Sequence, residues 1–367
     1  MSDDSKNTPK KESGIRIELV KEIKLPAAIL AVDAGRDNQH IYAACLDGGI
    51  YEVEINSGDR KRIGKHDNYA SGVANLSKAE TVISSGYDGK LQWHQPIQNT
   101  TSRTVQAHKF WSWQMAVSNN DRLVASVTGQ YLAGGYKYEP APEQEPSVQI
   151  YDTQSGQLRW SFSHLPPVLS VAFSPDNRFL AAGNMMGEVR IWDLETGNQV
   201  ASWTTPTFTS WGIIKSHHYI GGIFRLCFSP DSTELLACGM GSMNDPMAGN
   251  GKQTWERFAW KENPVRKSGQ IHESDNGNGL METIAFHPSK QFFVMAGRLA
   301  QGTWNCGFFS ESTGRLIHSA DTKMRVVDAL FLNEGHQLLL AGASSQEKVK
   351  DGKYPEFGRL KLYNCFT

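Results

Sequence analysis

A unit of about 41 residues recurs along the chain and limits the folds that are open to it. The clearest copy is residues 173–198, FSPDNRFLAAGNMMGEVRIWDLETGN, in which short apolar runs alternate with turn signals. An apolar residue, a turn of this kind and an apolar run return after Phe228, Phe286 and Phe331, with weaker copies upstream. Repeats of this length are typical of arrays in which each unit buries its apolar surface against its neighbours.

Each unit predicts four short strands joined by turns, which we name a to d. The runs are rich in Val, Ile, Leu, Phe and Trp, as strands are. Pro175 presets φ in a turn, Asp176 can accept a hydrogen bond from the backbone there, and Gly197 is free to take positive φ. Helical periodicity of any length is absent. The sequence therefore predicts an all-β protein.

The number of units follows from strand c, aligned on Trp192. Copies fall at Val53, His94, Tyr151, Trp192, Phe309 and Tyr363, with a poorly matched one near Ala259. The last copy ends the chain without a strand d, whereas Ile15–Val20 alternates with period two ahead of the first unit. We therefore expect seven blades over residues 15–367, with residues 15–24 as the outer strand of the last blade. Six or eight blades remain open because residues 205–274 are irregular.

These features resemble the WD-repeat β-propellers. The resemblance rests on the period near 41, the FSPD turns and Trp192-Asp193, and it covers about residues 15–367. His66, His108 and His164 stand where that family often places a histidine before the next blade. The resemblance implies a single propeller that acts as a protein-interaction scaffold.

Five segments are longer than the basic unit allows: 130–146, 205–222, 240–252, 268–280 and 343–358. All are b–c or d–a connections, and an antiparallel meander sends these two kinds of connection to the same end of the strands. Insertions on one face of a repeat protein commonly mark its working surface. We therefore expect another protein to bind at this face.

The candidate binding residues are aromatic, Met and His side chains of this face, and aromatic residues and Met are enriched at recognition surfaces. They are Trp111, Trp113, Tyr136, Tyr138, Trp211, His217, His218, Met243, Met247 and Tyr354. The alternative is that these aromatics only cap the propeller. Trp111 and Trp113 could likewise wedge between blades or line a pocket near the central channel.

No catalytic, metal or cofactor motif is found. His217 and His218 are adjacent, so their side chains diverge on an extended segment, and residues 274–282 fail the spacing of a calcium loop. Phosphate-binding loops and nucleophile elbows are also absent. The alternative function is an enzyme or small-ligand binder of lactonase-like or quinoprotein-like type, which needs side chains such as Glu282 and Asp328 to converge at the channel mouth.

Composition narrows the partners and the compartment. Lys and Arg total 37 against 38 Asp and Glu, so no basic footprint predicts nucleic-acid binding. No apolar run approaches the roughly 20 residues of a membrane helix. The five cysteines are widely spaced, which predicts free thiols and the cytoplasm. Residues 1–14 are expected to form a disordered polar tail, and the protein alone to be monomeric.

Overall fold

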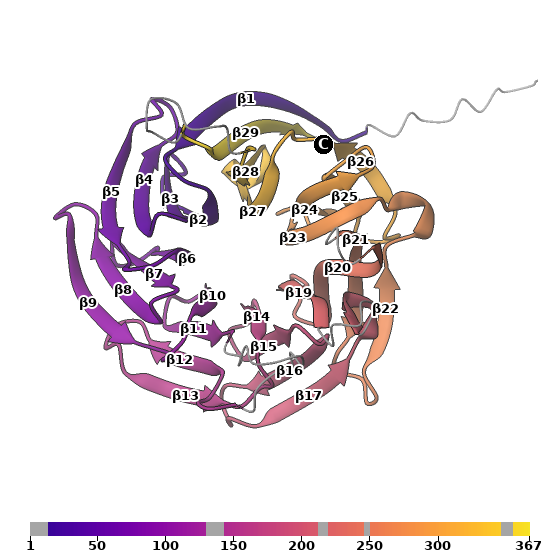
Figure 1. The fold of residues 1–367 in the computed structure, drawn as a ribbon, viewed down its shortest axis with the longest axis horizontal. Helices are drawn as coiled ribbons and strands as arrows, with labels where there is room; N and C mark the ends of the chain where they lie inside the picture. Colours follow the sequence, from indigo (N-terminus) through magenta and orange to yellow (C-terminus); the bar gives the residue numbers. More distant parts are fainter. Residues whose placement is uncertain (1–13, 130–142, 212–218, 246–249, 346–354) are drawn as a thin grey trace, which may run out of the picture.

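The computed structural model describes residues 14–129, 143–211, 219–245, 250–345 and 355–367, and the side chains of these ranges apart from 209–220 and 242–250. The described strands form five four-stranded antiparallel sheets and one nine-stranded sheet, which joins two further four-stranded units and a short extra strand. The four-stranded units are arranged side by side around a ring (Figure 1). The tail predicted over 1–14 lies outside these ranges except for Gly14. The all-β prediction is confirmed.

The units, or blades, follow the chain order, and strands a to d run from the inside of the ring outward (Figure 1). Blade 1 comprises β2 (Ile29–Ala34), β3 (His40–Cys45), β4 (Gly49–Glu54) and β5 (Arg60–Lys65), and blade 2 comprises β6 (Ala70–Leu76), β7 (Thr81–Gly86), β8 (Lys90–Gln95) and β9 (Thr100–Gln106). Blade 3 comprises β10 (Ser112–Val117), β11 (Leu123–Thr128), β12 (Val148–Asp152) and β13 (Leu158–Phe162), and blade 4 comprises β14 (Val168–Phe173), β15 (Phe179–Asn184), β16 (Glu188–Asp193) and β17 (Gln199–Thr204). Blade 5 comprises β19 (Tyr219–Phe228), β20 (Leu235–Asp245), β21 (Asn250–Ala259) and β22 (Arg266–Gln270), and blade 6 comprises β23 (Asn278–Phe286), β24 (Phe292–Gln301), β25 (Cys306–Ser310) and β26 (Leu316–Ala320). Blade 7 comprises β27 (Arg325–Leu332), β28 (Gln337–Ala343), β29 (Gly358–Phe366) and β1 (Arg16–Leu25). The remaining elements are β18 (Thr209–Trp211) and the short helices η1 (Pro206–Phe208), η3 (Glu273–Asp275) and η4 (Asn333–Gly335).

Both ends of the chain build the last blade, as predicted. Strand β1 runs antiparallel to β29, with Ile17 opposite Cys365 and Ile23 opposite Leu360. Without β1, the backbone groups along β29 would form an exposed edge that other chains could pair with. The N-terminal strand therefore closes the ring.

The inner strands surround a central channel of about 320 Å³. Its lining comes from β2, β6, β10, β14, β19, β23 and β27, which are the first strands of seven blades. Seven blades are therefore present among the described residues, and the alternatives of six or eight are excluded.

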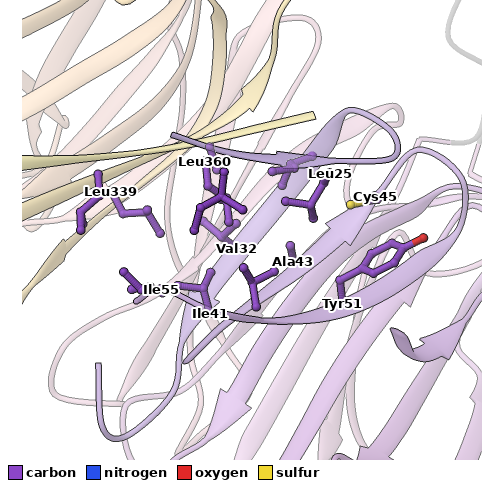
Figure 2. Packing of buried hydrophobic residues seen from close by; sticks show 14 of the residues in the cluster. Leu25, Val32, Ile41, Ala43, Cys45, Tyr51, Ile55, Leu339 and Leu360 are labelled. Atoms are coloured by element: carbon purple, nitrogen blue, oxygen red, sulfur yellow. The ribbon is translucent and has the colours of Figure 1, made fainter. Parts of the chain in front are cut away.

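The core is divided among the interfaces between blades rather than gathered in one place. Each neighbouring pair of blades encloses its own apolar cluster, and Figure 2 shows the cluster between blades 7 and 1. Along β3, Ile41 and Ala43 pack into this cluster, whereas Tyr42 and Ala44 pack against blade 2. Successive side chains of a strand point to opposite faces, so both faces of these blades are buried. This explains why the strands read as continuous apolar runs.

The turn of the best repeat forms as its residues predict. The amide of Ser174 donates to the carbonyl of Phe179 at 2.9 Å, and Asn177 takes a φ of 62°. The carboxylate of Asp176 accepts from the amide of Arg178 at 3.1 Å. The Ser-Pro-Asp turn is thus closed by its own side chains.

Blade 5 departs from the sequence alignment. Strand β21 pairs Arg257 with Leu236, as β16 pairs Trp192 with Leu180, so Arg257 and not Ala259 occupies the Trp192 position. The alignment on Ala259 was wrong because a polar residue fills this largely buried place, where it forms ion pairs with Glu234 and Glu311. Much of segment 240–252, expected to be a loop, is an extension of β20 and β21.

Within the described residues no helix is long and apolar enough to span a membrane. All five cysteines are free thiols, and burial raises the pKa of Cys227 to about 11.

Candidate functional site

The face that carries the b–c and d–a connections, which we call the insertion face, holds a stack of aromatic rings over blades 2 and 3. Tyr87 stacks on Trp111 with 4.9 Å between ring centroids and on Trp113 at 5.7 Å. Tyr69 lies 5.4 Å from Tyr87, and Phe110 lies 4.7 Å from Trp111. These five residues form the aromatic cluster. Three separate connections contribute to it, namely β5–β6, β7–β8 and β9–β10.

Backbone contacts bring two of these connections together. The carbonyl of Gly89, in the β7–β8 turn, accepts hydrogen bonds from the amides of Ala107 and His108 at 2.9 and 3.0 Å. Gly89 has a φ of 73°, and a Cβ there would lie 2.2 Å from the carbonyl oxygen of His108. Glycine is therefore required for the turn to approach the segment that carries Phe110 and Trp111.

A buried polar network fixes the third connection. His66 Nδ1 is hydrogen-bonded to Asp88 at 2.9 Å, its Nε2 to Ser84 Oγ at 2.8 Å, and Ser84 Oγ also to His94 Nε2 at 2.8 Å. The amide of Asp67 donates to Asp88 at 3.1 Å. The network ties the segment before Tyr69 to the turn that carries Tyr87.

The protonation states of this network follow from burial. Burial lowers the pKa of His94 to about 4, so the ring is neutral near pH 7. Burial also tends to raise the pKa of Asp88, but hydrogen bonds from His66, Asp67 and Lys90 outweigh it, and the pKa lies below its usual value. Asp88 is therefore ionised near pH 7, and its carboxylate can accept the hydrogen bond from His66 Nδ1.

Trp113 extends the aromatic cluster to the mouth of the channel. It lies on β10 and, with Tyr87 and Leu169, lines a cavity of about 140 Å³. Of the two readings of this residue, the wall of a pocket near the channel is the one its position fits. Drug-sized ligands usually occupy cavities of roughly 300–1,000 Å³, so the space suits a single side chain better.

The channel also brings charged side chains together from three blades. Arg325 binds Glu282 with two hydrogen bonds of 2.6 and 2.5 Å, and Arg225 is paired with Asp328. Asp328 also accepts from the amide of Val32 at 3.2 Å. The carboxylates thus converge as the enzyme alternative requires, but each is neutralised by an arginine.

The sequence candidates fare unequally. Trp111 and Trp113 are brought together in the aromatic cluster. Trp211 lies in β18 opposite Tyr219, and Met243 lies in β20 opposite Gly251, but their side chains are outside the described set. The other candidates fall outside the described residues altogether: Tyr136, Tyr138, His217, His218, Met247 and Tyr354.

Tyr69, Tyr87 and Phe110 were missed by the sequence reasoning, which considered long insertions first. They stand in short connections, and the parity that places the insertions on one face also places these residues there. Among the described residues no group of three or more His, Cys, Asp or Glu side chains could hold a metal ion.

Comparison with known proteins gives distant matches. The family model described as "WD domain, G-beta repeat" matches residues 156–193. WD repeat-containing protein SL1-17 of Schistosoma mansoni is 24% identical over 45% of this chain and 65% of its own length. An uncharacterized WD repeat-containing protein of Deinococcus radiodurans is 24% identical over 67% of this chain and 86% of its own length. Target of rapamycin complex subunit wat1 of Schizosaccharomyces pombe is 25% identical over 43% of this chain and 41% of its own length. The chain thus spans less than two thirds of the first and third of these relatives.

Proposed function

Since this chain belongs to the WD-repeat family, we propose that it is a non-catalytic scaffold that binds a partner protein through its insertion face. The observation that carries the proposal is the aromatic cluster, where stacked rings are held on a rigid support while Tyr69 remains 43% exposed. Tyr and Trp dominate the energetics of many protein interfaces because they bury much area at a small entropy cost.

The relatives support the same class of function. One of them is named as a subunit of the target of rapamycin complex. A fold shared with such proteins suggests assembly rather than catalysis, although the fold by itself does not define a function. The partner of this chain is therefore proposed to be a protein.

The channel gives less support to the enzyme or ligand-binding alternative. General acid–base catalysis needs a group that can exchange a proton near neutral pH. Asp33 also lines the channel and burial raises its pKa to about 6, but its carboxylate already accepts hydrogen bonds from the amides of Ala34 and Asn75. The carboxylates of Glu282 and Asp328 form ion pairs with Arg325 and Arg225. We therefore assign these ion pairs to the stability of the ring.

The proposal extends to the surroundings of the protein. Free and mostly buried thiols fit the reducing cytoplasm, and balanced charge fits a partner that is neither nucleic acid nor membrane. We propose that the protein alone is monomeric.

The test is the affinity for a copurified partner, identified by mass spectrometry and then measured as a dissociation constant. Trp111→Ala removes the ring that joins Tyr87 to Phe110, and it should weaken binding by about 2 kcal/mol or more, roughly 30-fold. The control replaces residues 194–197, a tight c–d turn on the opposite face, with another tight-turn sequence and should leave binding unchanged.

Thermal unfolding of both variants separates binding from folding. If the turn replacement weakens binding while a folded Trp111→Ala protein binds normally, the aromatic cluster is only a cap and the proposed function is wrong.

A further inference from the structure

The face opposite the insertion face, built from a–b and c–d turns, has a cleft of about 840 Å³ between blades 2 and 3. One wall comes from Leu76, Lys78, Ala79, Thr81 and the ends of β8 and β9, and the other from residues 120–122 and the β12–β13 turn. The cleft shares no residue with the aromatic cluster. It is therefore a separate surface of the protein.

Four cations line this cleft. Lys78 and Arg122 are exposed, and neither side chain takes part in an ion pair among the described residues. Arg103 donates to the uncharged carbonyl of Gln154 at 2.8 Å, so its charge is also uncompensated. Arg159 lies 3.7 Å from Asp152.

The two carboxylates of the cleft, Asp121 and Asp152, are already hydrogen-bonded to other groups. Asp121 accepts from Ser77 Oγ at 2.6 Å and from the amide of Lys78 at 3.2 Å. Asp152 accepts hydrogen bonds from the amide and the hydroxyl of Ser155, both at 2.8 Å, and the hydrogen bond from the amide lowers the pKa of Asp152. Four cations against two anions leave the cleft with a net charge of +2, on a chain whose formal net charge is −1.

The floor of the cleft holds its walls in place. Trp93 Nε1, from blade 2, donates to the carbonyl of Thr153, in blade 3, at 2.7 Å. The guanidinium of Arg103 lies 5.4 Å from the centroid of the Trp93 ring. Gly156, with a φ of 70°, packs so closely that a Cβ there would lie 2.6 Å from the Arg103 side chain. The cation is thus positioned before any ligand binds, which reduces the entropy lost on binding.

We propose that this cleft is a second docking site, which takes an acidic segment of a partner protein. Arginine presents a planar fork of donors that matches carboxylates, and a cleft lined by one sign of charge concentrates oppositely charged ligands. Because the cleft and the aromatic cluster lie on opposite faces, the propeller can hold two protein segments at once. The inference does not depend on what binds the insertion face.

The test uses the full chain and a fluorescein-labelled probe peptide of alternating Glu and Ser or Gly, with a matched peptide in which Gln replaces Glu. Fluorescence anisotropy should show binding of the Glu peptide that weakens as salt rises, and at least tenfold weaker binding of the Gln peptide. Lys78→Glu combined with Arg122→Glu should lower the affinity about tenfold or more. The matched control is Arg62→Glu with Lys65→Glu on the exposed face of β5, which changes the net charge by the same amount. This control should lower the affinity for the Glu peptide by less than twofold.

Three results would overturn the inference. One is the absence of binding at low salt, and another is an equal loss in the two double variants, which would show that only the total charge matters. The third is tighter binding of polyuridine than of the peptide with the same dependence on Lys78 and Arg122, which would make the occupant a nucleic acid. Trp111→Ala should bind the peptide normally, so failure of this inference is distinct from failure of the proposed function.

Discussion

Blades 2 and 4 divide the characteristic features of the WD repeat between them. Blade 4 has the most regular sequence, with its FSPD turn and Trp192-Asp193, and a family model matches this region. Blade 2 has neither feature, since its strand c carries His94 in the Trp192 position. Nevertheless, it is in blade 2 that His66, Ser84, Asp88 and His94 form a continuous buried network.

In blade 4 the corresponding polar positions are filled differently. Ala182 stands in place of Ser84, so His164 Nε2 is hydrogen-bonded only to the carbonyl of Ala182, at 3.3 Å. Asn184 instead ties the turn to the preceding connection by donating to the carbonyl of Leu165 at 3.0 Å. A regular motif therefore indicates how strands and outer turns form, whereas the rigidity of the insertion face depends on less conspicuous residues.

The largest effect expected from this comparison is that of Ser84→Ala in blade 2. The change removes the partner shared by His66 Nε2 and His94 Nε2, and each unsatisfied buried group costs about 1–3 kcal/mol. The free energy of unfolding, measured in urea at pH 7.5, should fall by about 3 kcal/mol. A loss below about 1 kcal/mol would show that the network does not distinguish blade 2 from blade 4.

The second effect is a pH dependence that both blades share. Burial lowers the pKa of His94 to about 4 and that of His164 to about 3, whereas an unfolded histidine titrates near 6.5. As the pH falls below about 6.5 the unfolded chain takes up these protons first, so stability present at neutral pH is lost progressively toward pH 4. When the pH is lowered from 7.5 to 5.0, each such histidine should reduce the free energy of unfolding by about 2 kcal/mol.

His164→Gln isolates the contribution of blade 4. The variant should lose about 2 kcal/mol less than the unaltered protein between pH 7.5 and 5.0, whatever its stability at pH 7.5. The same substitution at the exposed His272 is the control. Asp33 acts in the opposite direction because burial raises its pKa to about 6, so the difference between variants is more informative than the total slope. Equal pH dependence in all three proteins would contradict a buried neutral His164.

The smallest effect should come from placing a serine at position 182 of blade 4, where blade 2 has Ser84. Ala182→Ser places a hydroxyl beside the ring of His164, and one additional hydrogen bond contributes about 0.5–1.5 kcal/mol before the cost of fitting the oxygen. We expect a change in the free energy of unfolding of less than about 1 kcal/mol in either direction. A larger loss would show that blade 4 has no room for the network found in blade 2.

Much of the fold could be predicted from the sequence because its signals are local. The Ser-Pro-Asp turn depends on Ser174 and Asp176, which bond within the turn, and the alternation at Ile15–Val20 is a property of one strand. The number of blades follows from repeated strands. The alignment failed at Arg257, where ion pairs with Glu234 and Glu311, residues of two separate turns, replace the expected apolar side chain.

The sequence by itself thus determined an all-β ring for which seven units was the favoured count, its closure by the first strand, and the face on which Trp111 lies, because periodicity and turn chemistry act over a few residues. Only the tertiary structure decided which side chains meet. Tyr69, Tyr87 and Trp111 come from separate connections, and Lys78 and Arg122 come from different blades. Such contacts depend on how neighbouring blades pack, and no local pattern records the distance between two residues that are far apart in the chain.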